Sequence, residues 1–181
     1  MRRGAQPLFF GALVAALAVS GCGSGSDTSA APDGDQPSSA EQQEQGLRDV
    51  DPCQLLTPEE AAEFGFSGEG YDETLVDTEP ACGFDGGPFG ATFTVSRENT
   101  VETYGQGDNW ARFDRIEIDG RAAARAVDES ASSSGDFCTV MFDAGGGAIT
   151  IDVSEFRNPE NVDPCDFAQQ IAEVIAPRMP R

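Results

Sequence analysis

Apolar and polar residues alternate along several stretches of the chain, which is the pattern of strands that bury one face. The alternation is clearest in residues 89–96, where Phe, Ala, Phe and Val are separated by smaller or polar residues. Further stretches of this kind lie at 116–118 and from 122 onward, and at 137–143 and 148–154. Asp119-Gly120 and Gly145-Gly146-Gly147 separate the members of these pairs, and both are typical of hairpin turns. We expect about five or six strands.

Two stretches have the signals of helices, and they lie on either side of the strands. Thr57 can cap a helix that has Pro58 in its first turn, and Glu60 completes a capping box. The second helix begins at Asp163-Pro164, and Pro177 ends it. Its apolar face consists of Phe167, Ile171, Val174 and Ile175. The order predicts an α+β fold, an antiparallel sheet with the N- and C-terminal helices packed on one face.

The first 21 residues have the features of an export signal. Arg2 and Arg3 precede an apolar run over 8–19, which is short for a membrane span of about 20 residues. Val19-Ser20-Gly21-Cys22 follows and resembles the bacterial lipobox. We therefore expect residues 1–21 to be a lipoprotein signal peptide, and Cys22 to carry acyl chains. Such chains would anchor the protein to the extracytoplasmic face of the cell membrane.

Residues 22–49 contain the acylated cysteine and a polar tether without aromatic residues. Ser, Gly, Asp, Gln, Ala and Pro dominate it, so it cannot bury enough apolar surface to order itself. The composition changes at Val50, and residues 50–181 are expected to form one domain.

The formal net charge is −21, and every basic residue is arginine because lysine and histidine are absent. This acidity argues against nucleic acid as a partner, because binding phosphates requires clustered basic residues. The missing residue types exclude Ser-His-Asp and Ser-Lys catalysis and histidine-ligated metals. Carboxylate chemistry and calcium remain, but Asp72, Asp77 and Glu79 lack the spacing of an EF-hand loop. We expect no enzyme, no cofactor and no metal site.

Four cysteines remain beside Cys22, an even number that indicates two disulfides in an exported protein. Three connectivities are possible. We favour Cys53–Cys165, since both cysteines lie in Asp-Pro-Cys triplets where the two helices begin. Cys82–Cys138 would then join two strand-like segments. A redox site is not expected, because Cys-x-x-Cys spacing is absent.

The opening motif of the domain is Asp51-Pro52-Cys53-Gln54-Leu55-Leu56-Thr57-Pro58-Glu59-Glu60-Ala61. With the lipobox, the tether and the later cysteines, it resembles actinobacterial lipoproteins that carry domain of unknown function 3558. Phe84 stands where that family often has tryptophan. A looser likeness is to the extracellular sensor domains of mycobacterial receptor kinases. The resemblance implies location and fold, and it carries no activity and no catalytic residue.

Two functions fit these features. The first is a ligand-binding or sensor-like module for an unknown small molecule or protein, with aromatic residues lining a concave sheet face. Trp110 is the best candidate contact because it lies in a loop-like stretch, residues 105–110, where an apolar ring needs a reason. Phe89, Phe93, Tyr104 and Phe113 are the other candidates, and each is also a candidate for the core. The alternative is a structural or accessory interaction protein of an envelope complex.

Overall fold

The computed structural model describes residues 46–132, 136–157 and 161–181. The expected signal peptide, Cys22 and most of the tether lie outside the described residues. Leu47 is only 2% exposed and belongs to the main core. The core therefore includes a residue that precedes Val50, where the domain was expected to begin.

The centre of the fold is a seven-stranded sheet in which every neighbouring pair is antiparallel. This confirms the antiparallel sheet and corrects the expected number of strands. The order is β1-β2-β3-β7-β6-β5-β4. The strands are β1 (Tyr71–Asp72), β2 (Ala81–Gly86), β3 (Phe89–Ser96), β4 (Trp110–Ile118), β5 (Arg121–Asp128), β6 (Phe137–Ala144) and β7 (Gly147–Glu155).

Both expected hairpin turns are present, and both use left-handed backbone. Asp119 and Gly120 have φ of 51° and 69° between β4 and β5. Gly145 and Gly146 have φ of 50° and 84° between β6 and β7. Two successive positive φ angles match the twist of an antiparallel pair, which is why such residues favour tight hairpins.

The helices begin at the predicted caps. The 3₁₀ turn η1 (Pro52–Gln54) precedes α2 (Pro58–Glu63), where Thr57 and Glu60 form the capping box. Asp163 caps α4 (Pro164–Ile175) by accepting hydrogen bonds from the first-turn amides. The turn η2 (Ala176–Arg178) follows α4.

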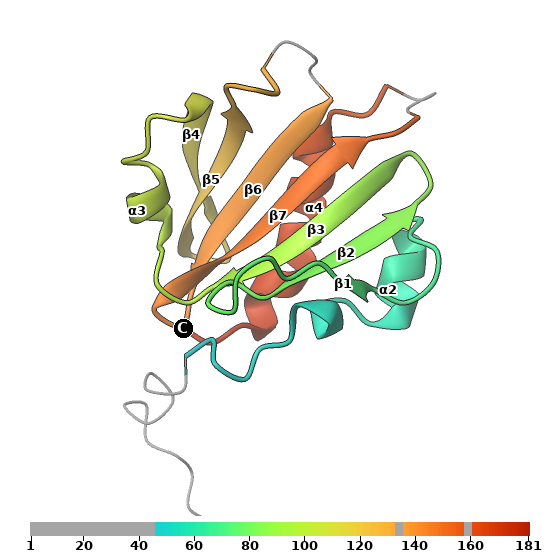
Figure 1. Ribbon diagram of the computed structural model, residues 1–181, viewed down its shortest axis with the longest axis horizontal. Coiled ribbons are helices and arrows are strands. Elements are labelled where there is room, and N and C mark those ends of the chain that lie inside the picture. Colours follow the sequence, from blue (N-terminus) through green and yellow to red (C-terminus); the bar gives the residue numbers. More distant parts are fainter. Residues whose placement is uncertain (1–45, 133–135, 158–160) are drawn as a thin grey trace, which may run out of the picture. The chain divides into compact units, whose positions relative to one another are not determined.

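One face of the sheet holds the main core. Figure 1 shows α4 (red) crossing behind β6 and β7, and the contacts between these elements agree. Phe167 of α4 stacks on Phe89 of β3 with ring centroids 4.5 Å apart, and it also meets Phe64 and Phe66 after α2. Phe93 of β3 is fully buried in the same core. The segment that includes η1 and α2 therefore packs around the same core as α4.

The opposite face carries a smaller apolar cluster. The short helix α3 (Val101–Tyr104) contacts β5 and β6 there. The cluster consists of Val101, Ala124, Ala126 and Met141, with Tyr104, Trp110 and Phe113 packed against it.

The disulfides join Cys53 to Cys82 and Cys138 to Cys165, each with 5.1 Å between Cα atoms, so the favoured connectivity is wrong. The sheet order explains this result. β2 and β6 are separated by β3 and β7, which places them about 14 Å apart at about 4.8 Å per strand, beyond the reach of a disulfide. Moreover, η1 contacts β2 and β3, whereas α4 contacts β6 and β7.

Candidate ligand-binding cavity

A cavity of about 470 Å³ lies beside the first disulfide. One wall comes from the opening motif, between Asp51 and Ala61, and the other from the loop 68–70. Phe84 of β2 and Cys53 also line it. A cavity of this size falls in the range that small ligands occupy.

Local capping fixes the first wall. Asp51 accepts a hydrogen bond from the backbone N–H of Cys53 at 2.9 Å and another from Gln54 Nε2 at 2.8 Å. Thr57 Oγ1 accepts from the N–H of Glu60 at 3.2 Å, while the Glu60 carboxylate accepts from the N–H of Thr57 at 2.9 Å. The wall is therefore held in place before any ligand arrives.

The second wall is the loop 68–70, whose backbone lies close to the side chains of Cys82 and Phe84. A Cβ at position 70 would lie 2.5 Å from Cys82 Sγ and 2.6 Å from the Phe84 ring, so only glycine fits there. Gly68 has φ of 86°, the left-handed region that favours glycine. The loop 68–70 can therefore pass close to β2 without filling the cavity.

The lining combines an apolar floor with an acidic rim. Leu56, Ala61 and Phe84 are buried residues of the main core that reach the cavity. Of the described residues that line it, Asp51 and Glu69 are charged, and both are acidic. An anionic ligand would meet two carboxylates here, so the cavity suits a neutral or cationic molecule with an apolar body.

A smaller cavity of about 270 Å³ lies beside the β6–β7 turn and contains Arg121 and Arg181. Arg121 donates to the backbone oxygens of Pro180 and Met179, both at 2.7 Å. Arg181 donates to the Asp119 carboxylate at 3.0 Å. These guanidinium groups hold the C-terminal segment against the sheet, so this cavity is a weaker candidate.

Trp110 lies away from the cavity beside Cys53. Its Nε1 donates to the backbone oxygen of Tyr104 at 2.8 Å, and its ring lies 5.9 Å from that of Phe113. These contacts account for the position of the Trp110 ring without a bound ligand. The role of Trp110 as a ligand contact stays a prediction. Phe89 and Phe93 belong to the main core, so they do not line a concave surface.

Two of the acidic residues near β1, Asp72 and Glu79, accept hydrogen bonds from different neighbours and do not share one. Glu79 accepts hydrogen bonds from Ser96 at 2.9 Å and Asn99 at 3.2 Å. Asp72 accepts from the N–H of Thr74 at 2.9 Å. Within 46–132, 136–157 and 161–181, no three acidic or cysteine side chains are grouped as a metal site.

Sequence reasoning missed Asp152 in β7, a residue whose pKa is shifted. Burial raises its pKa to about 6, although a hydrogen bond from Thr139 Oγ1, at 2.5 Å, opposes the shift. It also missed the cavity residues Gln54, Leu56 and Glu69, which no chemical motif marks. The sequence signal nearest to Gln54 and Leu56 was the group of capping residues in the opening motif, Asp51, Thr57 and Glu60.

The described part of the chain contains no helix of the length and apolar character that a membrane crossing requires. Neither a curated protein nor a solved structure matches the chain. A family model matches residues 17–178, a range that includes the opening motif and all five cysteines. The chain belongs to the family described as protein of unknown function (DUF3558).

Proposed function

We propose that this protein is a ligand-binding module anchored to the extracytoplasmic face of the cell membrane through Cys22. The ligand is a small molecule with an apolar body and no negative charge. The cavity between the opening motif and the loop 68–70 carries this proposal, because its apolar floor and acidic rim are held in place by capping and by the Cys53–Cys82 disulfide.

The anchoring rests on Val19-Ser20-Gly21-Cys22 and on a family match that begins at residue 17, before this motif. Acyl chains on one cysteine stabilise membrane attachment by about 0.8 kcal/mol per buried CH₂. We expect the full chain, expressed in a related host, to sediment with membranes and to carry acyl mass on a mature N-terminal Cys22. Recovery of Cys22→Ala protein in the same membrane-bound, acylated form would contradict the anchoring.

Mass spectrometry of the purified protein under native and denaturing conditions tests for a carried ligand. Extra mass in the native spectrum alone would be a bound ligand, and its fragmentation would give the chemical class. We expect that ligand to be neutral or cationic. An anionic ligand would contradict the role of Asp51 and Glu69 in the cavity.

A probe titration tests the cavity itself. Nile red, a neutral apolar dye, should bind saturably, and the anionic dye ANS should bind more weakly. Gln54 is exposed and lines the cavity, so Gln54→Trp places a large ring at the site and should abolish Nile red binding. Gln170→Trp is the matched control, because Gln170 is exposed on α4 and does not line the cavity.

Equal loss of binding in both tryptophan variants would contradict the site. Binding unchanged in Gln54→Trp would do the same. If no dye binds and the native mass is bare, the accessory role in an envelope complex becomes the better proposal, and crosslinking in cells is its test.

A further inference from the structure

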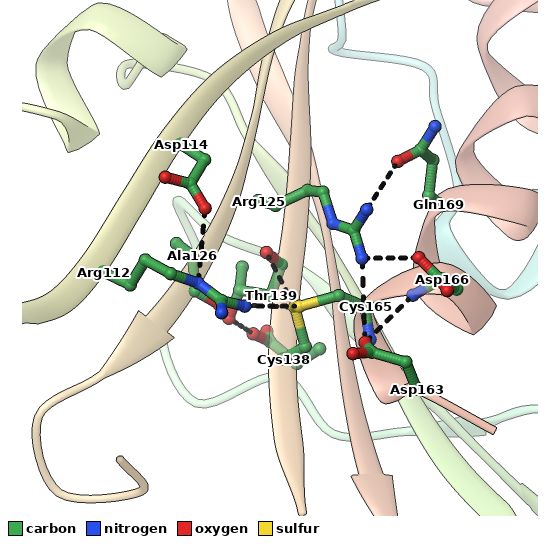
Figure 2. The surroundings of a disulfide bond; sticks show 11 residues. Arg112, Asp114, Arg125, Ala126, Cys138, Thr139, Asp163, Cys165, Asp166 and Gln169 are labelled. Atoms are coloured by element: carbon green, nitrogen blue, oxygen red, sulfur yellow. Dashed lines mark hydrogen bonds and ion pairs between the residues drawn. A yellow bond between two sulfur atoms is a disulfide. The ribbon is translucent and has the colours of Figure 1, made fainter. Parts of the chain in front are cut away.

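The second disulfide has a cationic side chain beside one of its sulfurs. Cys138 of β6 is bonded to Cys165 in the first turn of α4, and Arg112 Nη2 lies 3.4 Å from Cys165 Sγ. Figure 2 shows the Arg112 side chain extending from β4 towards the sulfur. A guanidinium at this distance would stabilise a thiolate on Cys165 if the bond opened.

Both sulfur-bearing residues line a cavity of about 380 Å³, so a small thiol has a route to them. Arg112, Ser132 and Phe137 line the same cavity. Cys138 and Cys165 are themselves almost fully buried, at 0% and 2% exposed. A reagent must therefore enter the cavity to reach the bond.

The nearby carboxylates are paired with arginine. Arg125 Nη2 lies 2.6 Å from Asp166 Oδ1 and 3.6 Å from Asp163 Oδ1. Arg112 Nε lies 3.3 Å from Asp114 Oδ2 (Figure 2). Cys165 also stands at the amino end of a 12-residue helix, where the helix dipole favours negative charge.

The charged groups around the first disulfide differ from these. Cys53 is partly exposed beside the larger cavity. Among the described residues, Asp51 and Glu69 are the charged ones on its wall, and no arginine lines it. Exposure alone would make Cys53–Cys82 the easier bond to reduce. The direct contact with Arg112 favours Cys138–Cys165, because a thiolate leaves faster when an adjacent positive charge stabilises it.

We propose that Cys138–Cys165 is a thiol–disulfide exchange site for an extracytoplasmic dithiol, and that Cys53–Cys82 is a structural bond. One thiolate of the dithiol attacks Cys138 Sγ. A mixed disulfide forms, and the electron pair of the broken bond stays on Cys165 Sγ as a thiolate beside Arg112. The second thiolate of the dithiol then attacks the dithiol's own sulfur in the mixed disulfide and displaces Cys138, which takes up a proton. The dithiol is oxidised by two electrons, and the protein disulfide is reduced by two.

This exchange requires neither the cavity beside Cys53 nor its ligand. Ala168, Ile171, Ala172 and Ile175 bury α4 in the main core, so the helix has apolar contacts that do not depend on the disulfide. The Cys53–Cys82 bond also remains when Cys138–Cys165 opens.

Graded reduction of the exported full chain tests the proposal. The folded protein is treated with dithiothreitol, new thiols are blocked with iodoacetamide, and labelled cysteines are identified by peptide mass. We expect Cys138 and Cys165 to be labelled about tenfold faster than Cys53 and Cys82. Faster labelling of Cys53 and Cys82, or equal rates at all four cysteines, would overturn the assignment.

Substitutions of arginine separate the electrostatic effect from a packing effect. Arg112→Gln should slow the reduction of Cys138–Cys165 severalfold, and Arg112→Lys should restore part of the rate. Arg115→Gln is the matched control, since Arg115 also lies on β4 but pairs with Glu102 at 2.7 Å. In the reduced protein, Arg112→Gln should also move the midpoint of Cys165 alkylation to a higher pH, because the thiolate loses its neighbouring positive charge. An unchanged rate and pH profile in Arg112→Gln would overturn the role of the guanidinium.

Discussion

Arg178, in η2 after α4, donates two parallel hydrogen bonds to the carboxylate of Glu60, 118 residues earlier in the chain, at distances of 3.1 and 2.8 Å. A third hydrogen bond, from Arg178 Nη2 to the backbone oxygen of Leu55, measures 2.9 Å. Glu60 also closes the capping box of α2. One carboxylate therefore holds the first α-helix of the domain and joins it to the C-terminal segment.

Arg178→Gln should lower the free energy of unfolding by about 1 kcal/mol at neutral pH, since bidentate pairs are strong but this one is partly exposed. The hydrogen bond from Arg178 is the main cause that lowers the pKa of Glu60. The pair with Arg178 therefore stabilises the fold fully above the ordinary pKa of a glutamate. This stabilisation is lost as the pH falls through the lowered pKa of Glu60 in the folded state.

Urea unfolding at pH 7 and at pH 3 measures this difference. Arg115→Gln breaks a more exposed pair with Glu102, so it should lower the free energy of unfolding by less than Arg178→Gln does. An equal cost in the two variants, or an Arg178→Gln effect that does not shrink at pH 3, would show that the pair has no special role.

Tryptic mapping distinguishes the disulfide connectivities, because the chain contains no lysine and trypsin can cut only after arginine. Cys53 and Cys82 lie in one peptide, 49–97, whereas Cys138 and Cys165 lie in 126–157 and 158–178. We expect a linked pair of the last two peptides, and peptide 49–97 two hydrogens lighter than its reduced form. A product that joins 49–97 to either of the others would disprove the pairing.

Asp152→Asn should stabilise the protein at pH 8. Burial raises the pKa of Asp152 to about 6 from the ordinary 3.8, so the folded state binds the proton more tightly than the unfolded state. Its ionisation therefore costs stability as the pH rises from about 4 to about 6, by at most about 3 kcal/mol. Thermal unfolding should show a gain for the variant at pH 8 that disappears at pH 4. A gain of the same size at both values would mean that charge is not the cause.

Trp110→Phe should cost about 1 kcal/mol, because it leaves the backbone oxygen of Tyr104 without its indole donor. Guanidinium unfolding followed by far-ultraviolet circular dichroism measures it. Trp110 does not line the cavity beside Cys53, so Nile red should bind Trp110→Phe as it binds the wild-type protein. A loss of Nile red binding in Trp110→Phe would therefore be the result that brings Trp110 into the site.

Local signals predicted the starts of the two main helices and both tight hairpin turns, but not α3 or β1. The Thr57 and Asp163 caps, the Asp119-Gly120 turn and the glycine turn after β6 are all determined by residues close in sequence. Such features depend on a few neighbouring dihedral angles and hydrogen bonds. They can therefore be predicted from the sequence without knowing which strands pair.

The disulfide pairing could not be predicted in the same way, because it depends on strand order. β7 inserts between β3 and β6, and this non-local pairing carries Cys82 away from Cys138. The contact between Arg112 and Cys165 spans 53 residues and depends on the same order. Alternation in a strand shows which face a residue occupies, but it does not show which strand lies beside it.

The Cys53–Cys82 bond has a mechanical consequence for a domain that is loaded from its N-terminal end. A pull on residue 46 would first act on Leu47 and on the hydrogen bonds from Arg97 to the backbone oxygens of Leu47 and Arg48. Once these yield, the chain can extend only as far as Cys53, where the covalent bond passes the force to β2. β2 is paired with β3 along its length, so the load would be shared across the ladder instead of peeling α2 from the core.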